Sequence, residues 1–106
     1  MQGVRVVKQL SLFLRNEPGA LANMAEHLSA AGINVLGFTV ADSVDHAVIR
    51  FVVDDSKKAL HLLGDLGALV VDTDILAVDL ENAPGALTNL GIRLSEAGVN
   101  IDYAYG

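Results

Sequence analysis

A chain of 106 residues that is 52% hydrophobic is long enough to bury one modest core, and that content argues against disorder. Its net charge of −6 argues against a nucleic-acid partner, because phosphate binding needs clustered Lys and Arg, and its lack of cysteine excludes a disulfide framework and a thiol nucleophile. No apolar run approaches the roughly 18 residues of a membrane span, so a soluble cytoplasmic protein without membrane partners is the simplest interpretation.

Hydrophobic periodicity predicts alternating strands and helices along the first two thirds of the chain. The first strand shows the pattern best, because Leu10, Leu12 and Leu14 share one face while Gln9 and Phe13 fall on the other. In chain order, the predicted strand, helix, strand, strand, helix and strand lie at 9–15, 18–31, 33–41, 47–53, 56–66 and 68–71.

This order predicts an α+β, ferredoxin-like βαββαβ fold. Right-handed crossovers place both helices on one face of a four-stranded antiparallel sheet. Asp72-Thr73-Asp74 is the expected break before a further strand that carries Leu76, Val78 and Leu80.

An internal repeat divides the chain. Twelve of the 24 residues from Leu12 to Val35 recur unchanged 66 positions later. The repeat predicts a first unit at 1–73 and an incomplete second unit, β-α-β only, at 74–106. A complete second unit would extend to about residue 140 if the period held. Either the sequence continues past Gly106, or the short unit borrows strands from a partner.

The inventory of reactive side chains argues against an enzyme. The three histidines, His27, His46 and His61, fall in three different predicted elements and lack metal-ligand spacing. Paired aspartates fall at turns and helix starts, where they satisfy backbone donors. No phosphate-binding glycine motif is present. We therefore predict no catalytic residue, no metal and no cofactor.

The repeated turn before each helix carries a different chemistry. A helix that begins at Pro18-Gly19-Ala20 points its first N–H groups outward, and such an end accepts a carboxylate. Asn16 and Asn34 each offer both donors and acceptors, so a free amino acid fits this turn. The alternative is that Asn16 only closes a turn and that Pro-Gly only shapes the loop.

Two motifs, each present twice, resemble the ACT domain family. They are Asn-x-Pro-Gly-Ala-Leu, at Asn16–Leu21 and Asn82–Leu87, and Gly-[Ile/Val]-Asn, which ends at Asn34 and Asn100. The chain looks most like small stand-alone proteins made of two ACT units. The resemblance implies regulatory binding of an amino acid at the interface between ACT units, in a homodimer or higher homo-oligomer.

The ligand-binding residues implied by this resemblance belong to the two turns and to the asparagines that follow the helices. They are Asn16, Glu17, Pro18, Gly19, Ala20, Leu21, Asn34, Asn82, Pro84, Gly85, Ala86, Leu87 and Asn100. The serine-sensing members of the family use a histidine at the positions that Leu14 and Leu80 occupy here. This departure favours a more apolar amino acid than serine.

Two other functions compete with ligand sensing. ACT units also act as oligomerisation modules without a small-molecule ligand, and exposed sheet edges favour such pairing. An RNA-binding domain of the same plan stacks bases on aromatic residues of its central strands. The acidic charge and the absence of the matching aromatic motif argue against RNA.

Overall fold

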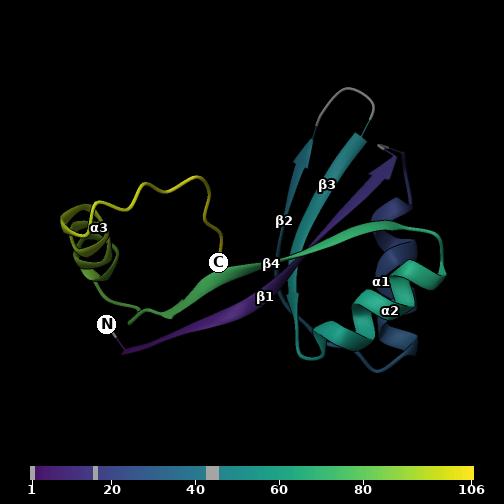
Figure 1. The fold of residues 1–106 in the computed structure, drawn as a ribbon, viewed down its shortest axis with the longest axis horizontal. Helices are drawn as coiled ribbons and strands as arrows, with labels where there is room; N and C mark the ends of the chain where they lie inside the picture. The colour runs from purple at the N-terminus through teal and green to yellow at the C-terminus, as the bar shows by residue number, and fades with distance from the viewer. Residues whose placement is uncertain (1, 16, 43–45) are drawn as a thin grey trace. The chain divides into compact units, whose positions relative to one another are not determined.

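The computed structural model describes residues 2–15, 17–42 and 46–106. Four strands and three helices form within these ranges (Figure 1). In chain order they are β1 Gln2–Arg15, α1 Ala20–Ala30, β2 Val35–Asp42, β3 His46–Val53, α2 Ser56–Asp65, β4 Leu69–Asp79 and α3 Ala86–Glu96.

The four strands form one sheet in the order β2-β3-β1-β4. β3 pairs antiparallel with both β1 and β2 and sets Phe51 opposite Leu10 on one side and Phe38 on the other. In Figure 1, α1 and α2 lie on the same face of this sheet. The α+β, ferredoxin-like fold predicted from the sequence is therefore confirmed.

The core lies between this sheet and the two helices. Its strand residues alternate as predicted, with Leu10 and Leu12 at most 1% exposed. The buried members of the core are Leu10, Leu12, Met24, Leu28, Ile33, Ile49, Phe51, Val53, Ala59 and Leu63.

Side-chain contacts also fix both helices of this core. The Asp55 side chain caps α2 by accepting a hydrogen bond from the Lys58 N–H, as predicted for this helix start. The Lys58 ammonium donates to the Ala31 carbonyl oxygen at 2.6 Å. A cation at this end of α1 complements the helix dipole.

The prediction of a break at 72–74 is wrong, because β4 continues through these residues to Asp79. β1 is correspondingly longer than predicted and begins at Gln2. Two ion pairs link the strands: Lys8 Nζ lies 2.7 Å from Asp74 Oδ1, and Arg5 Nη1 lies 3.1 Å from Asp79 Oδ2. Sheet pairing along β1 thus overrides the low strand propensity of aspartate.

The Lys8 ion pair also affects ionisation. The hydrogen bond that the Lys8 ammonium donates to Asp74, together with the negative charge of Asp74, raises the pKa of Lys8, and Asp72 adds a smaller contribution. The second strand expected in the second repeat does not form: residues 97–106 contain neither helix nor strand.

Two compact units make up the chain. The larger unit contains Lys8–Asp74 and Tyr105–Gly106, and the smaller unit contains residues 2–7 and Ile75–Ala104. β1 and β4 each contribute residues to both units. The boundary at 73/74 that the repeat predicts stays a prediction.

Gln9 departs from the exposure expected for it. Alternation placed it on the solvent face with Phe13, yet it is 1% exposed and is the one buried polar side chain among the described residues. The Tyr105 hydroxyl donates to Gln9 Oε1 at 2.8 Å. Residues 96 positions apart therefore meet, a contact that no local pattern predicts.

We expect Tyr105→Phe to lower the free energy of unfolding by about 1 kcal/mol, because it removes a partly buried hydrogen bond. Urea denaturation of Tyr105→Phe, Gln9→Ala and the double variant measures the coupling of the pair. A coupling energy of about 0.5–1.5 kcal/mol is expected. Additive effects of the two single variants would contradict a direct interaction.

Candidate functional site

The two repeated turns have the same backbone conformation. Gly19, the N-cap of α1, has φ 86° and ψ −8°, and Gly85, the N-cap of α3, has φ 88° and ψ −10°. Only glycine adopts this left-handed conformation readily, so the motif specifies the shape of the turn. Neither N-cap bonds the helix through a side chain. The first N–H groups of both helices therefore lack the usual side-chain acceptor at this position.

The first turn is open to solvent. Glu17, Pro18 and Gly19 are exposed, Ala20 is half-buried and Leu21 is 43% exposed. Asn16, the residue expected to contribute a polar contact here, lies outside the described residues.

Asn34 is held at the start of β2 by its backbone. Its N–H donates to Asp54 Oδ1 at 3.0 Å, and the Asp54 N–H donates to the Asn34 carbonyl oxygen at 3.1 Å. Asn34 itself is exposed. The residue is thus fixed in place while its carboxamide remains accessible.

Helix geometry separates Asn34 from the first turn. The turn precedes α1, whereas Asn34 follows the end of this helix of 11 residues. At a rise of about 1.5 Å per residue, the two helix ends lie roughly 16 Å apart. A free amino acid is much shorter than this distance. Asn34 and the turn of the same repeat therefore cannot hold one such ligand together.

In the second repeat, the two ends of α3 carry two separate open hollows. One hollow, of about 100 Å³, lies at the start of α3 and contains Pro84 and Ala86 of the predicted residues. The full lining of this hollow is Leu80, Glu81, Ala83, Pro84, Ala86 and Asn89.

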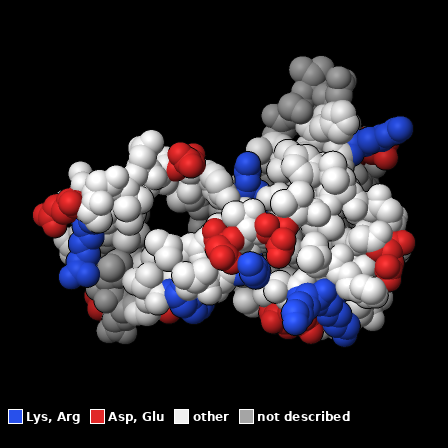
Figure 2. All heavy atoms as spheres, viewed as in Figure 1, with Lys and Arg blue, Asp and Glu red and all other residues white. Residues whose placement is uncertain are grey.

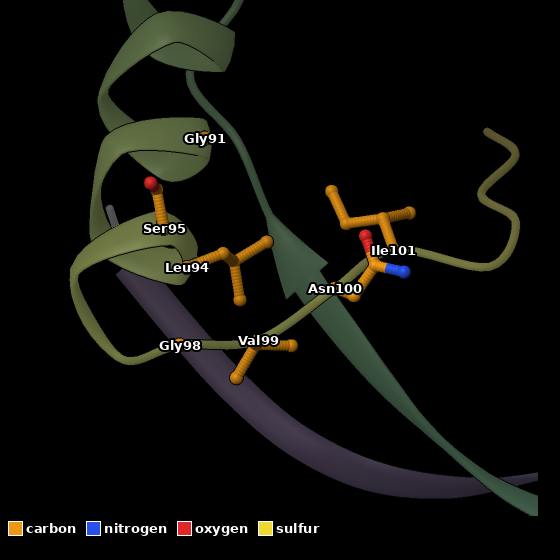
Figure 3. A pocket seen from close by; sticks show the side chains of 7 residues that line it. All are labelled: Gly91, Leu94, Ser95, Gly98, Val99, Asn100 and Ile101. Atoms are coloured by element: carbon orange, nitrogen blue, oxygen red, sulfur yellow. The ribbon is translucent and has the colours of Figure 1, made fainter.

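The other hollow, of about 370 Å³, lies at the end of α3 and contains Asn100 (Figure 3). Its lining is Gly91, Leu94, Ser95, Gly98, Val99, Asn100 and Ile101. The two hollows share no residue, and Asn82, Gly85 and Leu87 line neither. Gly91, Leu94 and Ser95 were not among the residues expected from the sequence, although their i, i+3, i+4 spacing marks one helix face.

Glu81 is the one charged residue that lines the hollow at the start of α3, and no charged residue lines the hollow at its end. In Figure 2, acidic and basic side chains are interspersed over the visible surface. Within the described ranges, no three His, Asp or Glu residues gather in a way that would hold a metal ion. No helix in those ranges is long and apolar enough to cross a membrane.

Comparison with known families settles the relationship that the motifs suggest. A family model described as an ACT domain pair matches residues 5–106. The chain belongs to the ACT domain family. This membership supports a regulatory, ligand-sensing role in general.

Several solved structures resemble the chain in fold. Protein BT0572 from Bacteroides thetaiotaomicron is 37% identical, with a TM-score of 0.90 over 96% of this chain and 71% of its own. The ligand-free regulatory subunit of aspartate kinase from Thermus thermophilus is 20% identical, with a TM-score of 0.71 over 99% of this chain and 82% of its own.

The corresponding subunit from Thermus flavus is 22% identical, with a TM-score of 0.66 over 99% of this chain and 82% of its own. At these identities the two aspartate kinase subunits support the fold alone. No curated protein matches the chain.

Proposed function

We propose that this ACT protein is a non-catalytic sensor of a free amino acid, bound where two ACT units meet. The observation that carries the proposal is the pair of identical left-handed turns at the starts of α1 and α3. Each turn lies at the positive end of a helix dipole, and such a helix end suits the carboxylate of an amino acid.

The roughly 16 Å between the ends of α1 supports an interface site rather than a site within one unit. A small ligand can contact both a glycine turn and an asparagine such as Asn34 only if one unit supplies the turn and another unit supplies the asparagine. Asn34 suits the second role because the Asp54 contacts fix its backbone and leave it exposed.

The preferred ligand has an apolar side chain. Leu14 and Leu80 stand where serine-sensing relatives carry a histidine, so they offer dispersion contacts and no hydrogen bond. Leu14 packs partly buried against the core, and Leu80 lines the hollow at the start of α3 at 40% exposure. Leucine and valine are therefore expected to bind more tightly than serine.

A thermal-shift screen of dialysed protein against the twenty amino acids tests the proposal. A ligand at about 100 times its Kd stabilises the folded state by roughly 2.7 kcal/mol, which corresponds to several degrees in Tm. We expect this shift for apolar amino acids and its loss in Asn34→Ala. Glu26→Ala, a truncation at an exposed position in the middle of α1, should keep the shift.

The second candidate function is assembly without a ligand. β2 lies at one end of the sheet order and exposes the apolar side chains of Leu36, Phe38 and Val40, each at least 47% exposed. Such an edge favours pairing with another sheet. Absence of a Tm shift for all twenty amino acids, in folded protein free of carried-over ligand, would contradict sensing and favour this function.

A further inference from the structure

Asp54 is held directly beside Asn34, where β3 ends and β2 begins. Its Oδ1 accepts a hydrogen bond from the Asn34 N–H at 3.0 Å, and its own N–H donates to the Asn34 carbonyl oxygen at 3.1 Å. The next pair along the two strands, Val35 and Val53, is in register, so these contacts continue the ladder. The Asp54 carboxylate is therefore anchored next to the residue to which the proposed function assigns a ligand contact.

The charge of this carboxylate is not neutralised by a neighbouring cation. Among the described residues, Asp54 takes part in no ion pair, and its second oxygen accepts no hydrogen bond. Lys58, four residues along the chain, donates instead to the Ala31 carbonyl oxygen at 2.6 Å. Asp54 is also exposed. It therefore presents a negative charge and a spare acceptor to solvent beside Asn34.

The end of α1 adds to the negative potential at this place. α1 ends at Ala30, only four residues before Asn34. The C-terminal end of a helix dipole carries partial negative charge and stabilises a nearby cation. The contact of Lys58 with Ala31 shows that an ammonium group is accommodated there. Asp54 supplies a further negative charge that Lys58 does not pair with.

We propose that Asp54 accepts the α-ammonium group of the amino acid and so excludes carboxylic acids of the same shape that lack the amine. This inference rests on the proposed function, in which a glycine turn of another unit receives the carboxylate. The two ends of the zwitterion then face opposite charges. Asn34 is neutral and does not distinguish the two ligand classes by charge, whereas an ammonium–carboxylate hydrogen bond is roughly twice as strong as a neutral one.

The neighbouring Asp55 provides a matched control. It is exposed like Asp54, and its Oδ1 also accepts one backbone N–H, that of Lys58, at 3.1 Å. This hydrogen bond caps α2 and does not involve Asn34. The two aspartates thus share charge, exposure and type of contact, and they differ in the residue that each one holds.

Asp54→Asn separates the charge of the carboxylate from its hydrogen bond, because an amide oxygen still accepts from the Asn34 N–H. Calorimetric titration compares leucine and valine with isocaproate and isovalerate, the same two molecules without the amine. We expect the wild type to prefer the amino acids at least tenfold. Asp54→Asn should weaken amino-acid binding at least tenfold and leave the affinity for isocaproate and isovalerate unchanged. Asp55→Asn should behave as the wild type does.

The outcomes distinguish this inference from the proposed function. If Asp54→Asn keeps the wild-type Tm and binds leucine as tightly as the wild type does, the role of Asp54 is overturned and amino-acid sensing stands. An equal loss of affinity for leucine and isocaproate would also overturn it, because Asp54 would then only position Asn34. A wild type that binds isocaproate as tightly as leucine overturns it without any variant. A wild type that binds neither leucine nor valine contradicts the proposed function, and this inference fails with it.

Discussion

Phe51→Ala is expected to destabilise the protein by about 3–5 kcal/mol, the range for truncation of a buried aromatic side chain. Phe51 is fully buried in β3, where it pairs with Leu10 of β1 on one side and Phe38 of β2 on the other. Removal of the ring leaves a cavity in the closely packed core between sheet and helices. Urea denaturation followed by far-UV circular dichroism should show a much lower midpoint with an unchanged slope.

Phe38→Ala is the matched control for this prediction. Phe38 lies directly opposite Phe51 on β2, but it is 52% exposed. We expect a loss of about 1 kcal/mol, which reflects the cross-strand pair and partial burial. Equal losses for the two variants would contradict the difference in burial between these two paired residues.

Hydrophobic alternation was sufficient to predict the architecture of the larger unit. Leu10 and Leu12 lie in the core, and the order of strands and helices follows from short polar connections between periodic segments. These features depend on local spacing, which the sequence states directly.

The errors arise where distant segments meet. Asp72 and Asp74 signal a turn by composition, yet pairing with a long β1 keeps them in a strand. Gln9 has the polarity of a surface residue, but Tyr105 covers it from the other end of the chain. Neither contact can be inferred from a stretch of ten or twenty residues, because its two partners lie much farther apart in the sequence. Only the tertiary structure reveals it.

The candidate site was predictable in its parts. The repeat predicted both glycine turns, and the structure gives them nearly equal backbone angles. Asn34 and Asn100 each follow the helix whose start carries the glycine turn of the same repeat. Once the helix bounds are known, the rise of an α-helix gives the distance between each asparagine and its turn. Where the second contributor to the site comes from depends on assembly, which no residue pattern specifies.

Leu10→Ala and Leu76→Ala compare the same residue at the same position of the repeat in two very different environments. Both remove the same side chain at the same repeat position, but Leu10 is 0% exposed and Leu76 is 58% exposed. We expect Leu10→Ala to cost about 2–5 kcal/mol, because it combines lost burial with a cavity in the core.

Leu76→Ala should cost less than about 1 kcal/mol in the monomer, because water already covers more than half of its side chain. Urea denaturation of both variants at a concentration that keeps the chain monomeric compares the two environments directly. Comparable losses would mean that Leu76 is as well buried as Leu10, contrary to its exposure in the structure.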